Sequence, residues 1–359
     1  MPEDHALRRD KLRALVAEQD ADAALVTRLV NVRYLTGFTG SNAALLVTAD
    51  QAVLATDGRY ITQSEQQAPD VERVIDRQCA TALVTRAGKN GVRRLGFEDH
   101  DVSVAMHATL AALDDAPELV RLSSPVEILR TVKDDGEIEL LRTACAISCR
   151  ALEDLLPSVA PGRTERDVAR DLENRMLDGG ADGRAFETIV ATGSNSAIPH
   201  HRPTDRQIAV GDLLKIDFGA LYLGYHADCT RTFMVGREAE EWQREIFDVV
   251  RAAQRAGRHA LTPGAELQGI DDAARDVVRR AGFGDQFTHG LGHGVGLEIH
   301  EAPLIGYTAE GRIEVRTPVT VEPGVYLPGR GGVRLEDTLV VGEGGPELLT
   351  TTPKDLVVL

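Results

Sequence analysis

Residues 217–232 read Asp-Phe-Gly-Ala-Leu-Tyr-Leu-Gly-Tyr-His-Ala-Asp-Cys-Thr-Arg-Thr and place two aspartates, Asp217 and Asp228, on either side of a turn. Apolar runs that predict strands flank the turn, and Asp217 follows one of them directly. Burying a carboxylate in a strand is costly unless the group is paired or bound to a metal. An ordinary turn aspartate is the alternative for each residue taken alone, whereas the pair favours a metal site.

Three further residues complete a candidate ligand set. His293 lies in His-Gly-Leu-Gly-His-Gly-Val-Gly, Glu322 precedes Pro-Gly, and Glu336 lies in an apolar run. With the two aspartates they make four carboxylates and one imidazole, an oxygen-rich donor set that fits two divalent ions with shared carboxylates. Such a site polarises a carbonyl and generates hydroxide at neutral pH, so the sequence indicates a metal-dependent hydrolase.

Other histidines near these ligands are candidates for moving protons. His200 lies in a loop that a proline on either side restricts, which holds the imidazole in place. We expect His201 beside it to be a bystander. His289 and His300 lie on either side of His293 in the sequence, and we expect each either to support a metal ligand or to lie on the substrate side of the site.

Three common motifs of other enzymes do not fit. The glycines around His293 do not form G-x-G-x-x-G, and Leu304 stands where H-E-x-x-H requires its second histidine. No G-x-S-x-G is present. The sequence therefore disfavours a dinucleotide site, a zincin and a serine hydrolase of the α/β type.

Composition restricts the partners. The chain has 359 residues, which predicts two domains, and a net charge of −16, which disfavours nucleic acid and anionic membranes. Its four cysteines form no C-x-x-C pair, which fits a reducing compartment. Neither a leader with an apolar core nor a membrane-spanning run is evident, so we expect a cytoplasmic protein.

The first part of the chain predicts a small α/β domain. Apolar spacing predicts a helix over 6–18. Short apolar runs bounded by turn residues predict strands over 23–26, 43–47, 52–55, 94–97 and 119–122. We expect this domain to end near Ser123-Ser124-Pro125.

The second part begins with a helix after Asp134, because Glu137 completes a capping box. A Pro-Gly, helix, Gly pattern then occurs twice, with helices expected over 164–177 and 267–280. It marks either an internal duplication or ordinary helix ends. In a duplication the metals lie between two halves, on strands expected over 213–218, 230–235, 320–322 and 333–341.

These stretches resemble the pita-bread metallopeptidases, the family of aminopeptidase P, prolidase, methionine aminopeptidase and creatinase. The matching stretches are Pro199-His200, Asp217-Phe-Gly, Asp228-Cys-Thr-Arg-Thr, residues 289–301, Glu322-Pro-Gly-Val-Tyr326 and Val333-Arg-Leu-Glu336-Asp. Residues 31–41 and 57–60 resemble the creatinase-type N-terminal domain. The resemblance implies an α+β fold, with a smaller α/β creatinase-type domain over residues 1–127. A pita-bread catalytic domain, a pseudo-twofold αβ duplication, is implied over 128–359.

The resemblance also implies two divalent ions, with manganese as the usual ion and cobalt or zinc as substitutes. In this arrangement Asp217 binds one ion, His293 and Glu322 chiefly hold the other, and Asp228 and Glu336 bridge the two. The oxygen-rich ligand set agrees with manganese over zinc.

Catalytic and substrate-binding roles follow from the same resemblance. The implied catalytic groups are His200 and His300, which contact the scissile carbonyl, and Glu322, which carries the proton. The implied substrate-binding groups are His289, Tyr326 and Arg334.

The activity implied by the resemblance is that of aminopeptidase P, which removes an N-terminal residue before proline. The substrates are then peptides with proline at the second position, and a homodimer is expected. An Xaa-Pro dipeptidase, or prolidase, is the alternative. A creatinase-like hydrolase and a binding protein without activity are remote alternatives, because the complete ligand set argues against both.

Overall fold

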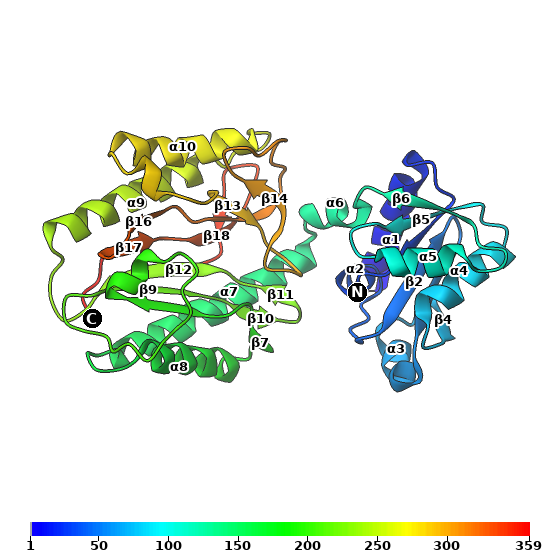
Figure 1. The fold of residues 1–359 in the computed structure, drawn as a ribbon, viewed down its shortest axis with the longest axis horizontal. Helices are drawn as coiled ribbons and strands as arrows, with labels where there is room; N and C mark the ends of the chain where they lie inside the picture. The colour runs from blue at the N-terminus through cyan, green and yellow to red at the C-terminus, as the bar shows by residue number, and fades with distance from the viewer. Residues whose placement is uncertain (1) are drawn as a thin grey trace. The chain divides into compact units, whose positions relative to one another are not determined.

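The computed structural model describes residues 2–359 and divides into two compact units, of which one ends at Arg130 and the other begins at Thr131 (Figure 1). Over these residues no helix combines the length and the apolar character that a membrane span requires. Each unit has its own sheets and its own core, so each is described by itself.

The N-terminal unit alternates helices and strands. Its elements are α1 (Pro2–Glu18), β1 (Ala23–Val26), α2 (Leu29–Thr36), β2 (Ala43–Thr48), β3 (Ala52–Thr56), α3 (Ile61–Gln67), β4 (Glu72–Ile75), α4 (Cys79–Lys89), β5 (Arg94–Glu98), α5 (Val104–Ala111), β6 (Glu118–Leu122) and α6 (Pro125–Thr131). All five predicted strands are present. The first has the predicted bounds, and each of the others differs by one residue at one end.

A six-stranded sheet organises this unit, in the order β4-β3-β2-β1-β5-β6. β2 is antiparallel to both of its neighbours, whereas β1 and β5, β5 and β6, and β3 and β4 pair in parallel. Leu83 of α4 and Leu110 of α5 pack with Leu25 and Leu46 of the sheet in one buried core. The alternation of strands and helices therefore forms the expected α/β domain.

The C-terminal unit carries the candidate ligands. Its elements are α7 (Asp135–Leu155), α8 (Glu165–Asp178), β7 (Gly183–Arg184), β8 (Ile189–Thr192), β9 (Leu213–Phe218), β10 (Ala220–Tyr222), β11 (Tyr225–His226), β12 (Cys229–Met234), α9 (Glu241–Ala260), α10 (Leu267–Arg280), β13 (Gly292–Gly294), β14 (Glu301–Ile305), β15 (Pro318–Val321), β16 (Gly324–Leu327), β17 (Gly331–Arg334), β18 (Asp337–Val340) and β19 (Glu347–Leu348). Asp134 caps α7 with Glu137 in the predicted capping box.

This unit consists of two halves of similar construction (Figure 1). In the first half, α7 and α8 pack against the antiparallel strands β8, β9 and β12. In the second half, α9 and α10 pack against a sheet that contains β13, β15 and β18. The helices α8 and α10 each have 14 residues and occupy the two positions of the sequence repeat. The arrangement confirms the expected αβ duplication.

Of the four strands predicted in this unit, the one over 213–218 has the predicted bounds, and those over 230–235 and 320–322 are displaced by one or two residues. The fourth is wrong in its extent. The apolar run over 333–341 forms two strands, β17 and β18, which separate at Leu335 and Glu336. The reason is that the backbone N–H of Glu336 donates to Thr230 O at 3.1 Å, on a strand of the other half. The break therefore brings Glu336 against the strand that follows Asp228.

Candidate active site

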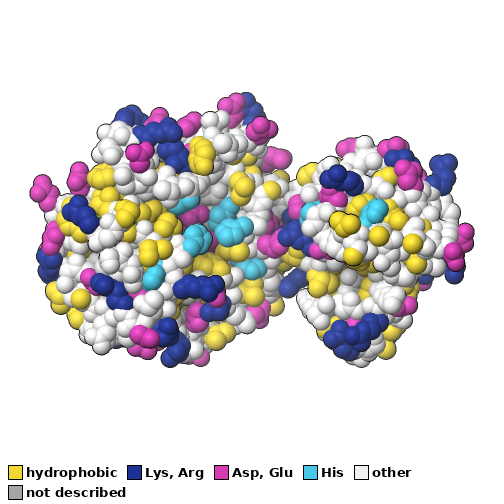
Figure 2. Space-filling model, in the orientation of Figure 1, with side chains coloured by type: hydrophobic (Ala, Val, Ile, Leu, Met, Phe, Trp, Pro, Cys, Tyr) yellow, Lys and Arg dark blue, Asp and Glu magenta, His cyan; other side chains and the backbone are white. Residues whose placement is uncertain are grey.

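A cavity of about 670 Å³ opens in the C-terminal unit, and its lining residues come from both halves. Histidine side chains gather in one hollow of this unit, next to acidic groups (Figure 2). Nine of the ten predicted site residues line the cavity: His200, Asp217, Asp228, His289, His293, His300, Glu322, Arg334 and Glu336. The structure thus brings together residues that the chain separates widely.

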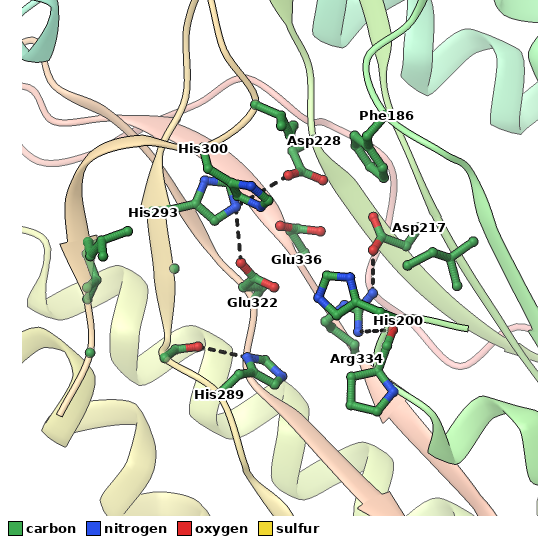
Figure 3. A pocket seen from close by; sticks show the side chains of 18 of the residues that line it. Phe186, His200, Asp217, Asp228, His289, His293, His300, Glu322, Arg334 and Glu336 are labelled. Atoms are coloured by element: carbon green, nitrogen blue, oxygen red, sulfur yellow. Dashed lines mark hydrogen bonds and ion pairs between the residues drawn. The ribbon is translucent and has the colours of Figure 1, made fainter. Parts of the chain in front are cut away.

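Three of the predicted metal ligands form the centre of the site. Single ligand atoms of Asp228, His293 and Glu336 all lie within 4.8 Å of one another, and all three residues are buried. Asp228 immediately precedes β12, His293 is the middle residue of β13, and Glu336 lies between β17 and β18. Strand ends from both halves therefore supply the cluster, and Figure 3 shows its carboxylates converging beside the ring of His293.

The orientation of His293 indicates that a cation belongs in this cluster. Its Nδ1 lies 2.9 Å from Gly294 O, and because a carbonyl only accepts, Nδ1 carries the proton in the neutral ring. Nε2 then has a lone pair, which faces Asp228 Oδ2 at 3.5 Å and Glu322 Oε1 at 3.4 Å. A nitrogen lone pair opposite two carboxyl oxygens needs a proton or a metal ion between them, and this set of one nitrogen and several oxygens fits a divalent ion.

Three carboxyl groups of the cluster have raised pKa values. Burial, followed by the nearby Glu336, raises the pKa of Asp228 well above its usual value. Burial, followed by Glu322, does the same to the pKa of Glu336. Burial raises the pKa of Glu322 to about 7 although Arg334 lowers it. A bound cation would offset these costs.

Asp217 lies on β9, and only one of its two carboxylate oxygens has a hydrogen-bond partner among residues 2–359. Its Oδ2 accepts from Arg334 Nη2, whereas its Oδ1 is buried and has no hydrogen-bond partner among residues 2–359. A buried oxygen without a partner is unusual in a folded protein. This oxygen is therefore available to bind a cation, and the predicted role of Asp217 as a ligand stays a prediction.

Two threonines that the sequence analysis missed hold the ligands in place. Thr230 Oγ1 donates to Glu336 Oε2 at 2.7 Å, and Thr320 Oγ1 donates to Glu322 Oε1 at 3.2 Å. Outer hydrogen bonds of this kind fix the orientation of metal ligands. The signal for Thr230 was present, because it lies two residues after Asp228 at the start of a predicted strand and so points to the same face.

A one-directional chain of hydrogen bonds runs along one wall. Arg334 can only donate, and its Nη1 donates to the Tyr326 hydroxyl at 2.9 Å. His289 Nδ1 lies 2.8 Å from Gly290 O and so carries the proton, which leaves Nε2 to accept from Tyr326 at 2.9 Å. Burial, followed by Arg334, lowers the pKa of His289 to about 3, which agrees with a neutral ring.

Tyr326 is the one predicted site residue outside the cavity lining. It is 4% exposed, and its hydroxyl contacts His289 and Arg334. The geometry thus gives Tyr326 the task of orienting these two groups, and its contact with substrate stays a prediction.

His200 and His300 lie on opposite sides of the ligand cluster (Figure 3). The ring of His300 meets that of His293 edge-on, with 4.4 Å between the ring centroids. Burial, followed by His293, lowers the pKa of His300. His200 is exposed on the loop that lines the cavity. Both imidazoles can therefore reach a carbonyl placed at the cluster.

His201, the expected bystander, anchors this loop. It is buried, and its Nε2 lies 2.8 Å from Glu165 Oε2. Thr192 N, Asn195 Nδ2 and Thr204 N also donate to Glu165. Burial raises the pKa of Glu165, but the bonds from Asn195 and His201 outweigh it, and the net shift is downward.

The glycines beside His293 serve the sheet itself. A Cβ at Gly292 would lie 2.0 Å from Thr320 O, and one at Gly294 would lie 2.2 Å from Ala302 O. Both positions therefore allow neighbouring strands to approach, and this close packing fixes the backbone that carries His293.

The family of the chain follows from comparison with known proteins. The family model described as "Metallopeptidase family M24" matches residues 139–343, and the one described as "Creatinase/Prolidase N-terminal domain" matches residues 8–132. The chain therefore belongs to metallopeptidase family M24. The two-domain α+β fold with a pita-bread unit is confirmed.

Relatives match over nearly the whole chain. An uncharacterized peptidase, YqhT of Bacillus subtilis, is 39% identical over 353 residues, which cover 98% of this chain and 99% of the relative. The solved structure of an Xaa-Pro dipeptidase from Bacillus anthracis has a TM-score of 0.95 at 36% identity and covers 99% of this chain and 100% of the other. That of an X-Pro aminopeptidase from Thermotoga maritima has a TM-score of 0.90 at 34% identity, covering 98% and 99%.

Proposed function

We propose that this metallopeptidase is an Xaa-Pro aminopeptidase that uses two divalent ions, with manganese as the native metal. The observation that carries the proposal is the lone pair of His293 Nε2 opposite the oxygens of Asp228 and Glu322. Asp217, Asp228, His293, Glu322 and Glu336 would hold the ions. When bound, such ions polarise the scissile carbonyl and lower the pKa of the attacking water.

The side chains around the cluster supply the remaining steps. His300 and His200 can donate hydrogen bonds to the carbonyl oxygen as negative charge develops on it. Glu322, a carboxylate of the cluster that the Thr320 hydroxyl orients, is suited by its position to accept the proton of the attacking water. The same carboxyl then returns this proton to the nitrogen of the leaving proline.

The cavity also accommodates proline. The peptide bond before proline is a tertiary amide without N–H, so an enzyme that binds substrate as a strand loses a hydrogen bond there. The lining includes the apolar side chains of Phe186, Leu304 and Tyr307, and a pyrrolidine ring can pack against such side chains.

The charges of the lining favour longer peptides over dipeptides. A dipeptide brings its C-terminal carboxylate close to the metals, where a free cation should receive it. Among the described residues that line the cavity there is no lysine and there are two arginines, Arg202 and Arg334. Arg334 is already bonded to Asp217, and the side chain of Arg202 is 86% exposed beside Glu187.

The names of two relatives favour the second candidate, an Xaa-Pro dipeptidase. In that case Arg202 is the cation that a dipeptide carboxylate can reach. Arg202→Ala should then raise the KM for Ala-Pro and leave the KM for Ala-Pro-Ala unchanged.

The decisive experiment compares Ala-Pro and Ala-Pro-Ala as substrates of metal-stripped protein refilled with manganese, beside Asp228→Ala. Cleavage of the tripeptide that needs both manganese and Asp228 supports the aminopeptidase. Cleavage of the dipeptide alone would establish the dipeptidase, and turnover of neither would overturn both proposals. Refilling with cobalt or zinc in parallel tests the choice of metal.

A homodimer and a cytoplasmic location are proposed on the family resemblance and on the composition. Light scattering of the purified protein and fractionation of the source cells test them directly.

A further inference from the structure

Lys215 is a buried basic residue near the ligand cluster, and the proposed mechanism gives it no role. It is 0% exposed and lies on β9, two residues before Asp217 and therefore on the same face of the strand. Burying a lysine is costly unless its N–H groups find acceptors. Its contacts should therefore reveal what it stabilises.

The acceptors of Lys215 are backbone carbonyls of the loop that carries His200. Its Nζ donates to Ile198 O at 2.7 Å and lies 3.4 Å from Pro199 O. Arg334 Nη1 donates to the same Pro199 oxygen at 3.1 Å. The side chains of Lys215 and Arg334 thus hold the backbone of the two residues that precede His200.

The loop is also anchored after His200, by the contacts with Glu165 described above. On the far side of His200, the His201 ring and Thr204 N bond Glu165. Lys215 bonds the residues just before His200, so the loop is fixed on both sides of this imidazole, which lines the cavity. Proline at positions 199 and 203 removes backbone donors, which makes side-chain anchors more important.

Lys215 does not contact the reacting atoms itself. It is absent from the cavity lining, and its Nζ lies 5.0 Å from the centre of the Tyr326 ring. An amine and an ammonium both carry N–H groups, so its bonds to carbonyl oxygens do not depend on its charge.

We propose that Lys215 is a positioning residue that holds the Ile198–Pro199 backbone so that His200 meets the scissile carbonyl. The proposal rests on the proposed function, which gives His200 its role. It predicts that the effect of Lys215 on turnover is transmitted through His200 and not through the metals.

A double-mutant cycle tests this route. Lys215→Met keeps an unbranched apolar stem of nearly the same length but removes the terminal N–H groups. Because small misplacements of a catalytic group cost up to about 100-fold, we expect a fall in kcat of about 10–100-fold on Ala-Pro-Ala, with KM and manganese content unchanged. In a His200→Ala background the same change should cost less than about 2-fold. An equal fall in both backgrounds, or loss of manganese, would overturn the proposal.

Lys133 provides the matched control. It is also buried, at 1% exposed, but its Nζ donates to Glu301 Oε2 at 2.8 Å. Lys133→Met and His200→Ala should therefore give independent, additive effects. Coupling of both lysines to His200 would indicate general loosening of the unit and would count against the specific role of Lys215.

A readout without turnover separates this proposal from the proposed function. Hydrogen exchange in peptides that cover residues 194–204 should rise in Lys215→Met and not in Lys133→Met. If wild type cleaves no Xaa-Pro peptide, the proposed function fails, while unchanged exchange would refute the anchor itself. If Lys215→Met does not fold, Lys215→Gln replaces it, since its amide keeps an N–H donor and should show a smaller effect of the same kind.

Discussion

Replacing the proposed ligand Glu322 with glutamine should stabilise the protein when no metal ion is bound. The side chain of Glu322 is 18% exposed and lies within the cluster, and its pKa is raised from 4.5 to about 7. A carboxyl with a raised pKa stabilises the folded state fully below the unfolded value. This contribution is lost as the pH rises from about 4.5 through about 7, because ionisation is then favoured only in the unfolded chain.

The size of the effect follows from the two pKa values. One pH unit corresponds to about 1.4 kcal/mol, so the rise from 4.5 to about 7 costs the metal-free protein roughly 3 kcal/mol at pH 8. For a unit of this length, each kcal/mol shifts the melting temperature by about 2–4 °C. Glu322→Gln should therefore gain about 6–12 °C on wild type between pH 5 and pH 8.

The quantity to measure is the difference in melting temperature between wild type and Glu322→Gln. Histidines of the site, His289, His293 and His300, have lowered pKa values, which make the folded state more stable as the pH rises. They are present in both proteins, so their contribution cancels. Calorimetry of chelator-treated wild type and Glu322→Gln across this pH range gives the difference directly.

Two controls complete the test. Glu343→Gln removes an exposed carboxylate of the same unit and should leave the pH dependence unchanged. Added manganese should reverse the order of the variants, because it binds the ionised ligand. A constant difference between wild type and Glu322→Gln from pH 5 to pH 8 would refute the reasoning.

Three further changes have defined outcomes. Thr230→Val removes the hydroxyl bonded to Glu336 and should weaken manganese binding by about 10–100-fold, measured by calorimetric titration; unchanged affinity contradicts the role of Thr230. Glu165→Ala leaves His201 and several buried N–H groups without their acceptor. It should lower the free energy of unfolding in urea by about 3–5 kcal/mol, and a loss below about 1 kcal/mol would contradict this role. Asp134→Ala removes the cap of α7 and should cost about 1 kcal/mol with unchanged kcat, so a slower enzyme would contradict a purely local cap.

Local signals made much of this site predictable. Strand β9 has the predicted bounds, and Asp134 caps α7 as expected, because both depend on neighbouring residues alone. The candidate ligands were recognisable because they are carboxylates and an imidazole in or beside apolar or glycine-rich stretches, in the order that the family resemblance implies. The helix over Glu241–Ala260 was overlooked, although its buried Ile246, Phe247 and Val250 have helical spacing.

Contacts between distant segments could not be predicted in the same way. The break before β18 depends on the bond from Glu336 N to Thr230 O, which only the folded chain creates. Lys215 stands inside an apolar strand, and nothing nearby in sequence shows that its acceptors are Ile198 and Pro199. Both contacts join residues that are far enough apart in the chain that only the folded structure shows them.

The split of the ligands between two halves has a consequence for biosynthesis. Thr230 and the carboxylate that it orients, Glu336, are 106 positions apart in the chain. While the ribosome is still adding the second half, the first half has only Asp217 and Asp228 to offer a cation. On the proposed ligand assignment, we therefore expect metal binding only after both halves have been synthesised, so that the ion does not guide the early folding of the nascent chain.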